Sequence, residues 1–239
     1  NVTGVQTCAL PICLATDNRL VVGYTALEED TRTSWRYQQL RSSFYILTRT
    51  LRGNTYRHAG GFVAMRKTDF MKRDGFSGNL NLLHGEYDYL VNKFGDDMAT
   101  TVALHPETHT LTKAPTKKEW INKQLYFWET RKYLQGGWFS RFLFNIDNIM
   151  LYLNYIVAIL CLVYGVIEER WLIVSVASAN ILLTVLLRIL FAHKAIKVFN
   201  VDLPAWRVIG IELMVPWRKI RSYFKYLKTD KYEFTSHKL

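Results

Sequence analysis

Cysteine is scarce in this chain of 239 residues, which contains only Cys8, Cys13 and Cys161. Three cysteines at these separations provide neither a disulfide framework nor the paired spacing of a structural zinc site. The sequence also lacks a G-x-G-x-x-G fingerprint, so nothing in it indicates a Rossmann dinucleotide site. A small disulfide-stabilised scaffold and a cysteine-based metal module are therefore excluded as interpretations.

Charge is missing from two long stretches. Residues 148–167 and 171–187 contain no Asp, Glu, Lys or Arg, and the apolar character continues past Arg188 to residue 192. As helices rising about 1.5 Å per residue, each run spans roughly 30 Å, the thickness of the hydrocarbon of a bilayer. Only Glu168, Glu169 and Arg170 separate the runs, so we expect an antiparallel transmembrane hairpin over residues 148–192. The alternative is a buried helical pair in a soluble core.

Positive charge flanks this expected hairpin on both sides. The chain carries 31 Lys and Arg against 20 Asp and Glu, a net charge of +11, and much of the excess lies in residues 113–141 and 194–221. Because Lys and Arg remain on the cytoplasmic side of membrane helices, both ends are expected to face the cytoplasm. This distribution favours anionic lipid headgroups as the partner and does not indicate nucleic acid.

The first thirteen residues, NVTGVQTCALPIC, do not read as a targeting signal, because they lack a basic region and a sustained apolar core. The string resembles translated adapter sequence, and we expect residues 1–13 to be a non-native leader. The native protein is then expected to begin near Leu14, with its upstream part missing.

The region before the hairpin alternates between short strand and helix patterns. Apolar residues at three- and four-residue spacing predict an amphipathic helix over residues 35–51. A strand pattern at residues 19–24 precedes this helix. After it come patterns at residues 62–65 (strand), 67–73 (helix), 86–94 (helix), 99–104 (strand), 105–115 (extended) and 116–134 (helix).

Basic and aromatic residues dominate the helix predicted before the hairpin and the segment after it. Residues 117–147 are expected to lie on the inner leaflet, where Trp120 and Trp128 either anchor in the headgroup layer or stack on a sugar or a polyprenyl acceptor. Residues 193–239 are expected to form a basic cytoplasmic or interfacial tail that Pro204 and Pro216 interrupt.

Three stretches together resemble the C-terminal half of a family-2 glycosyltransferase of GT-A fold. They are GGFVAMRKTDFMKRDGF at residues 60–76, HGEYDYLVNK at residues 84–93 and KKEWINKQLYFW at residues 117–128. The likeness is greatest to membrane-anchored bacterial members with a C-terminal hairpin. It implies an α/β fold: a partial, acceptor-side GT-A-like domain over residues 14–116, then the hairpin and the tail. It also implies the bacterial inner (plasma) membrane, with a multi-pass topology and a cytoplasmic soluble part.

The resemblance implies an inverting transferase that moves a sugar from a nucleotide-sugar donor to a lipid-linked or polysaccharide acceptor. A carboxylate at a helix start would deprotonate the acceptor hydroxyl, and Glu86 and Asp88 stand at such a start. The remaining residues that it implies for donor or acceptor binding are Gly60, Gly61, His84, Gly85, Lys123 and Gln124. A divalent metal ion, Mg or Mn, is expected for the complete family member. Its ligands belong to the donor half and not to this sequence.

The second motif departs from the family pattern. Aligning Leu90 and Lys93 with the family positions places Glu86 on the first acid and Tyr87 on the usual base aspartate, with Asp88 about 100° further round the helix. Three alternatives follow: Asp88 serves as the base through a local shift, Glu86 takes the role, or the base is missing. The last leads to a second hypothesis, a non-catalytic membrane protein that retains the fold as an interaction partner.

A third hypothesis is a hairpin membrane protein with an unrelated basic domain, which a soluble region without a central mixed sheet would indicate. Without the donor half, the chain by itself is expected to be inactive.

Overall fold

A three-stranded mixed sheet lies at the centre of the α/β part of the protein. The computed structural model describes residues 19–53, 55–58, 60–78, 85–95, 100–135 and 137–230. The sheet has the order β3-β1-β4, with β1 (Leu20–Gly23) antiparallel to β3 (Val63–Met65) and parallel to β4 (Thr100–Ala103). The central strand β1 is fully buried, as its uninterrupted apolar sequence requires. The central mixed sheet, whose lack would have indicated an unrelated domain, is present.

A second, smaller sheet was not predicted. It pairs β2 (Thr25–Leu27) in parallel with β5 (Thr110–Thr112), and the hydroxyls of Thr25 and Thr110 lie 2.5 Å apart. A 3-10 turn, η1 (Pro106–Thr108), precedes β5. The prediction of a purely extended segment over residues 105–115 is therefore only partly right, since a three-residue strand is too short to show a periodic pattern.

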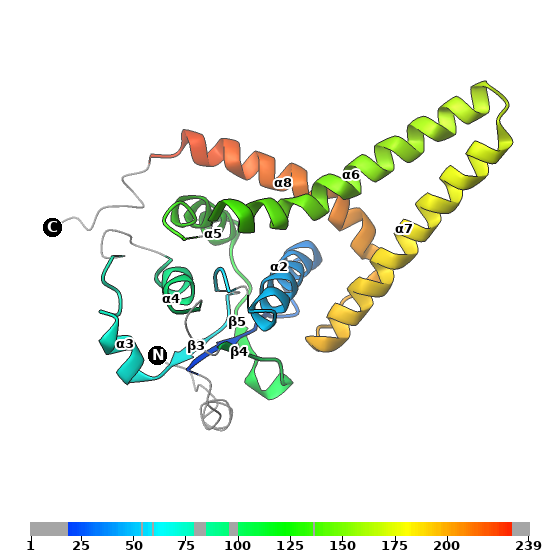
Figure 1. Ribbon diagram of the computed structural model, residues 1–239. Helices are drawn as coiled ribbons and strands as arrows, with labels where there is room; N and C mark the ends of the chain where they lie inside the picture. Colours follow the sequence, from blue (N-terminus) through cyan, green and yellow to red (C-terminus); the bar gives the residue numbers. More distant parts are fainter. Residues whose placement is uncertain are drawn as a thin grey trace.

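Four helices surround the sheet: α2 (Thr33–Leu51), α3 (Lys67–Lys72), α4 (Glu86–Gly95) and α5 (Lys117–Thr130). The predicted amphipathic spacing is confirmed in α2, where Leu40 and Leu47 are buried in the main core. Helix α5 begins with a capping box, in which Thr116 and Glu119 satisfy each other's backbone amides. Of these helices, α2 and α5 lie near the ends of the two long apolar helices that are closest to the sheet (Figure 1).

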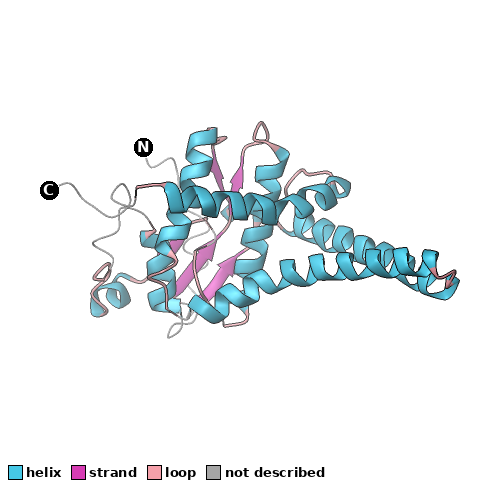
Figure 2. Cartoon of the chain, turned by 90° about the horizontal axis from the view of Figure 1, so that it is seen from above, coloured by secondary structure: helices cyan, strands magenta, loops and turns pink. Residues whose placement is uncertain are grey.

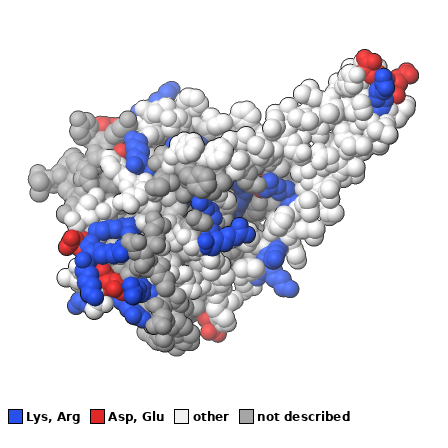
Figure 3. Space-filling view, in the orientation of Figure 1, with Lys and Arg blue, Asp and Glu red and all other residues white. Residues whose placement is uncertain are grey.

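Helices α6 (Gly137–Ile167) and α7 (Trp171–Val198) form an antiparallel pair that projects from the α/β part as an arm (Figures 1 and 2). Both helices are long and apolar enough to cross a membrane, and most of their apolar side chains are exposed. The helices extend beyond the predicted limits of 148–192 at both ends, and the last turns of α7 pack on the main core through Ala192 and Ile196. In Figure 3 the projecting length of the arm is white, and charged side chains appear at its tip and near its base, where α7 carries Arg188, Lys194 and Lys197.

Polar side chains join the two helices of the arm. The Asn180 amide donates to Asn154 Oδ1 at 3.0 Å, and the Asn154 amide donates to Thr184 Oγ1 at 3.0 Å. Hydrogen bonds of this kind satisfy polar groups that would otherwise lie in an apolar environment.

After the short turn η2 (Ala205–Arg207), helix α8 (Val208–Lys228) crosses back over α2 and α5 and also packs on α7. The predicted interruption at Pro216 is wrong, since α8 continues through it. Proline removes one backbone hydrogen bond from a helix. Near this gap the Tyr152 hydroxyl of α6 donates to the carbonyl of Leu213, and the packing on three helices holds α8 together.

Candidate functional site

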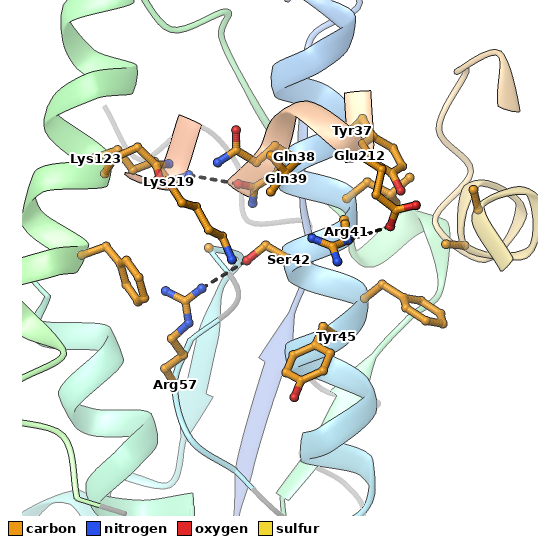
Figure 4. Close-up of a pocket in the computed structure, with 18 of the residues that line it drawn as sticks. Tyr37, Gln38, Gln39, Arg41, Ser42, Tyr45, Arg57, Lys123, Glu212 and Lys219 are labelled. Carbon is orange, nitrogen blue, oxygen red and sulfur yellow. Dashed lines mark hydrogen bonds and ion pairs between the residues drawn. The ribbon is translucent and has the colours of Figure 1, made fainter. Parts of the chain in front are cut away.

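A cavity of about 1040 Å³ lies between the α/β part and the base of the arm. Its walls come from α2, α5, α8 and the glycine turn before β3, and its floor is formed by residues 150–154 of α6 and 184–195 of α7. Figure 4 shows side chains from these elements converging on the space beside α2. Segments far apart in the sequence are thus brought to one site.

Three basic side chains gather at the end of the cavity nearest the glycine turn: Arg57, Lys123 and Lys219. Arg57 donates to Ser42 Oγ at 3.1 Å, and Lys123 donates to Gln39 Oε1 at 3.3 Å. Both acceptors lie on α2, so one face of this helix orients basic side chains from two other elements (Figure 4). We call Arg57, Lys123 and Lys219 the basic cluster.

The glycine turn is organised by the ring of His58. Its Nδ1 accepts a hydrogen bond from the Gly60 amide at 3.2 Å, which leaves Nε2 to donate to the Gly61 carbonyl. Gly60 has a φ of +90°, a conformation that favours glycine. A Cβ on Gly61 would collide with the backbone of Gly23 in β1, so this glycine allows the turn to lie directly on the sheet.

Asp88 on α4 faces the same cavity. Its Oδ1 accepts a hydrogen bond from the His58 backbone amide at 3.0 Å, which ties the first turn of α4 to the glycine turn. Burial lowers the pKa of both Arg57 and Lys123, and the Asp88 charge offsets part of that lowering. A carboxylate therefore lies within electrostatic reach of the basic cluster.

The electrostatics of the site oppose the charged forms of its bases. Burial among the cavity walls lowers the pKa of Lys123, and the Arg57 charge lowers it further. Burial also lowers the pKa of Arg57 and of His58. Burial and the crowding of positive charges both disfavour protonation, so a bound anion would relieve part of the cost.

The predicted site residues fall into three groups. The cavity is lined by Gly60, Gly85, Asp88, Lys123 and Gln124. Gly61 lies behind the lining, against the sheet, and Glu86 is half-buried in the first turn of α4 without lining the cavity. His84 lies outside the described residues.

The predicted roles for the tryptophans are changed by the packing of α5. Trp120 is buried, 8 % exposed, and stacks on Trp35 of α2 with ring centroids 5.2 Å apart, so it does not anchor in a headgroup layer. Trp128 donates from its indole to Ser222 of α8 at 2.9 Å. Helix α5 is thus held between α2 and α8.

Sequence reasoning missed the contributions of Arg57, Lys219 and Glu212 to the cavity wall. Glu212 of α8 is buried and bridges two arginines, with Oε1 3.2 Å from Arg41 Nε on α2 and 3.4 Å from Arg188 Nη1 on α7. The single acid in an apolar run was a usable signal, because a charge on a buried face needs partners. No comparable signal in the sequence distinguishes Arg57 or Lys219.

The opposite end of the cavity is largely apolar. Met150 and Leu151 of α6 and Leu187 and Phe191 of α7 line it, and Asn154 with Thr184 closes the floor between the two helices. Met150, Leu187 and Phe191 are exposed, so this end also opens toward the outer surface of the arm. The cavity therefore runs from a basic end beside the sheet to an apolar end within the arm.

Across the part of the chain that the structure describes, no group of three His, Cys, Asp or Glu side chains can hold a metal ion. No protein-family model matches the chain, and no curated protein or solved structure gives a significant match. The glycosyltransferase resemblance therefore rests on its three sequence motifs.

Proposed function

We propose that this chain is the acceptor-side part of a membrane-bound glycosyltransferase, which transfers a sugar from a nucleotide-sugar to a lipid-linked or polysaccharide acceptor at the cytoplasmic face. One observation carries the proposal: Asp88, at the start of α4, shares a cavity with the glycine turn and the basic cluster. These are the residue types that the reaction needs in one place, a base for the acceptor and cations for a diphosphate.

In the proposed reaction, the Asp88 carboxylate removes the proton from an acceptor hydroxyl. The resulting oxygen attacks the anomeric carbon of the donor, and the bond from that carbon to the diphosphate breaks, so the nucleoside diphosphate leaves. Arg57 would counter the negative charge on the departing group. The divalent metal ion expected for the complete enzyme is proposed for the donor half only. The described residues offer no site for it, so no step here uses one.

The arm supports a location at the bacterial inner membrane. Its uncharged length matches the hydrocarbon thickness, and Glu168, Glu169 and Arg170 at its tip would lie on the far side (Figure 3). Both ends of the hairpin, and the cavity with them, then face the cytoplasm, where nucleotide-sugars are available.

A sugar-transfer assay tests the proposal. It uses membranes that contain the protein expressed from its complete gene. Asp88→Asn removes the base and is expected to lower turnover by about 10²–10⁴-fold. The matched control is Asp69→Asn, an aspartate in the first turn of α3 that does not line the cavity and is expected to retain turnover. Glu86→Gln tests the alternative base. Unchanged turnover in both Asp88→Asn and Glu86→Gln would reject the assignment of either carboxylate.

A non-catalytic membrane protein is the second candidate, and Tyr87 favours it. This tyrosine occupies the position of the usual base aspartate and is half exposed, with its ring 5.7 Å from that of His58. Binding of nucleotide-sugars by the complete protein distinguishes the two candidates. A folded protein that binds none of them supports the interaction partner.

A further inference from the structure

The two ends of the cavity differ in chemistry, and the difference matches an amphiphile. Five Lys and Arg side chains and three carboxylates line the cavity, an excess of two positive charges. Glu212 is held by Arg41 and Arg188, so these three form a separate group at the junction with the arm. Among the remaining charged residues, the basic cluster is concentrated at one end, with Asp88 beside it, and Glu119 belongs to the capping box of α5.

The apolar end lies at the depth where a lipid chain would begin. Fourteen positions separate Asn154 from Glu168 at the tip, about 21 Å of helix. In a hydrocarbon layer about 30 Å thick, with the tip at the outer boundary, Asn154 then lies about 9 Å below the inner boundary. Met150, one turn earlier, lies close to that boundary. The cavity therefore connects the aqueous side with the inner leaflet.

We propose that this cavity binds a membrane lipid whose headgroup is a phosphate or diphosphate ester, with the phosphate on Lys123 and Lys219 of the basic cluster and the hydrocarbon chain along Met150, Leu187 and Phe191. The inference rests on the proposed function and names its acceptor as lipid-linked through phosphate. Between the two acceptors proposed above, a polysaccharide needs no apolar floor. A soluble phosphate compound likewise has no apolar group that would contact the apolar end.

The contacts of the basic cluster suit a phosphate group. Lys123 and Arg57 are held in place from α2, by Gln39 and Ser42, so their long side chains are oriented before a ligand arrives. Lys219 enters from α8 beside Lys123, and its side chain extends toward Ser42 and Arg57 (Figure 4). A phosphate at this place would receive charge-assisted hydrogen bonds from more than one side chain.

The test uses the full chain in phosphatidylcholine nanodiscs, and it requires no nucleotide-sugar. Three probes are titrated: farnesyl phosphate, which has head and chain; farnesol, which lacks the phosphate; and inorganic pyrophosphate, which lacks the chain. We expect saturable binding of farnesyl phosphate at least tenfold tighter than that of either other probe. Equal binding of farnesol overturns the phosphate assignment. Equal binding of pyrophosphate overturns the lipid and indicates a site for a free anion.

Matched variants locate the two ends of the site. Lys123→Gln and Lys219→Gln are each expected to weaken farnesyl phosphate at least tenfold, whereas Lys118→Gln, exposed on α5 outside the cavity, leaves its affinity unchanged. Phe191→Ala is expected to weaken it severalfold, and Leu190→Ala, a neighbour of similar exposure outside the lining, is not. Equal effects in test and control variants overturn the proposal.

The outcome is separable from that of the proposed function. Asp88→Asn is expected to lower transfer by about 10²–10⁴-fold while farnesyl phosphate still binds. If the complete protein binds farnesyl phosphate but transfers no sugar, the proposed enzyme activity is rejected and the lipid site is supported. If the protein transfers sugar to a soluble glycan but does not bind farnesyl phosphate, the proposed enzyme activity is supported and the lipid site is rejected.

Discussion

The carboxylate of Asp88 accepts a hydrogen bond from the backbone amide of His58, with 3.0 Å between the oxygen and the nitrogen. This contact joins the start of α4 to the glycine turn, two segments that lie thirty positions apart in the sequence. It places the acidic helix start and the glycine turn of the family pattern in one wall of the cavity.

Stability is expected to fall on acidification below about pH 6.5, partly through His58. The neutral ring accepts from Gly60 at Nδ1, and burial together with Arg57 and Lys123 lowers its pKa, although Asp88 and the Gly61 carbonyl oppose this. The unfolded chain therefore binds a proton at a higher pH than the folded chain. The folded state is stabilised above the unfolded pKa, and this contribution is lost as pH falls.

Thermal unfolding in detergent between pH 5 and pH 8 measures this dependence. His58→Gln is expected to reduce the pH slope, and His193→Gln, at an exposed position on α7, is expected to leave it unchanged. A remaining slope is assigned to His109, whose pKa burial also lowers. An identical slope in His58→Gln and the wild type would contradict the role of His58.

Gly61→Ala is expected to destabilise the fold by about 1–3 kcal/mol, because the new methyl group would press on the backbone of Gly23. Gly210→Ala in α8 meets nothing within 4 Å and is expected to stabilise by about 0.5–1 kcal/mol. Denaturant unfolding of both variants provides the comparison. A neutral Gly61→Ala would show that the turn lies further from β1.

Asn92→Ala is expected to cost about 2–4 kcal/mol of unfolding free energy. The Asn92 amide donates to the carbonyls of Tyr56 and Gln135, at 3.0 and 3.1 Å, and its oxygen accepts from the Gln135 amide at 2.7 Å. Removing this buried side chain leaves backbone groups from two segments without a partner. Hydrogen exchange at Gln135 should rise together with the loss of stability, and unchanged protection there would argue against this network.

Glu212→Gln is expected to destabilise the protein by about 3 kcal/mol, because it leaves two partly buried arginines without their common acid. Glu168→Gln, an exposed acid at the tip of the arm, is the control and should have little effect. The melting temperature in detergent is the readout. If both variants melt alike, the bridge contributes no net stability.

Periodicity predicted the long elements well. Leu40 and Leu47 lie on one face of α2, and Leu90 with Phe94 lies on one face of α4, so their spacing was informative. The uncharged runs likewise predicted α6 and α7. The strands β2 and β5 were missed because three residues that include only Ala26 and Leu27, or only Leu111, carry no pattern.

Site residues could be predicted only where they belong to a local sequence motif. Gly60, Gly85, Asp88, Lys123 and Gln124 share one cavity, and each belongs to a motif quoted from the sequence. Arg57 and Lys219 come from separate segments that only the tertiary packing brings together. The headgroup anchor expected of Trp120 is wrong for the same reason, because the stacking partner Trp35 is far away in the chain. Stacking of Trp120 on an acceptor stays a prediction, since this residue lines the cavity.

The bridge through Glu212 has a mechanical consequence. It fastens α2, a wall of the cavity, to α7, a helix of the arm. In the proposed membrane, a bilayer that is thicker or thinner than the arm changes the tilt of its helices. Through the two arginines, that change of tilt would shift α2, which orients Lys123 and Arg57. The thickness of the surrounding lipid would therefore change the affinity of the cavity for its proposed ligand.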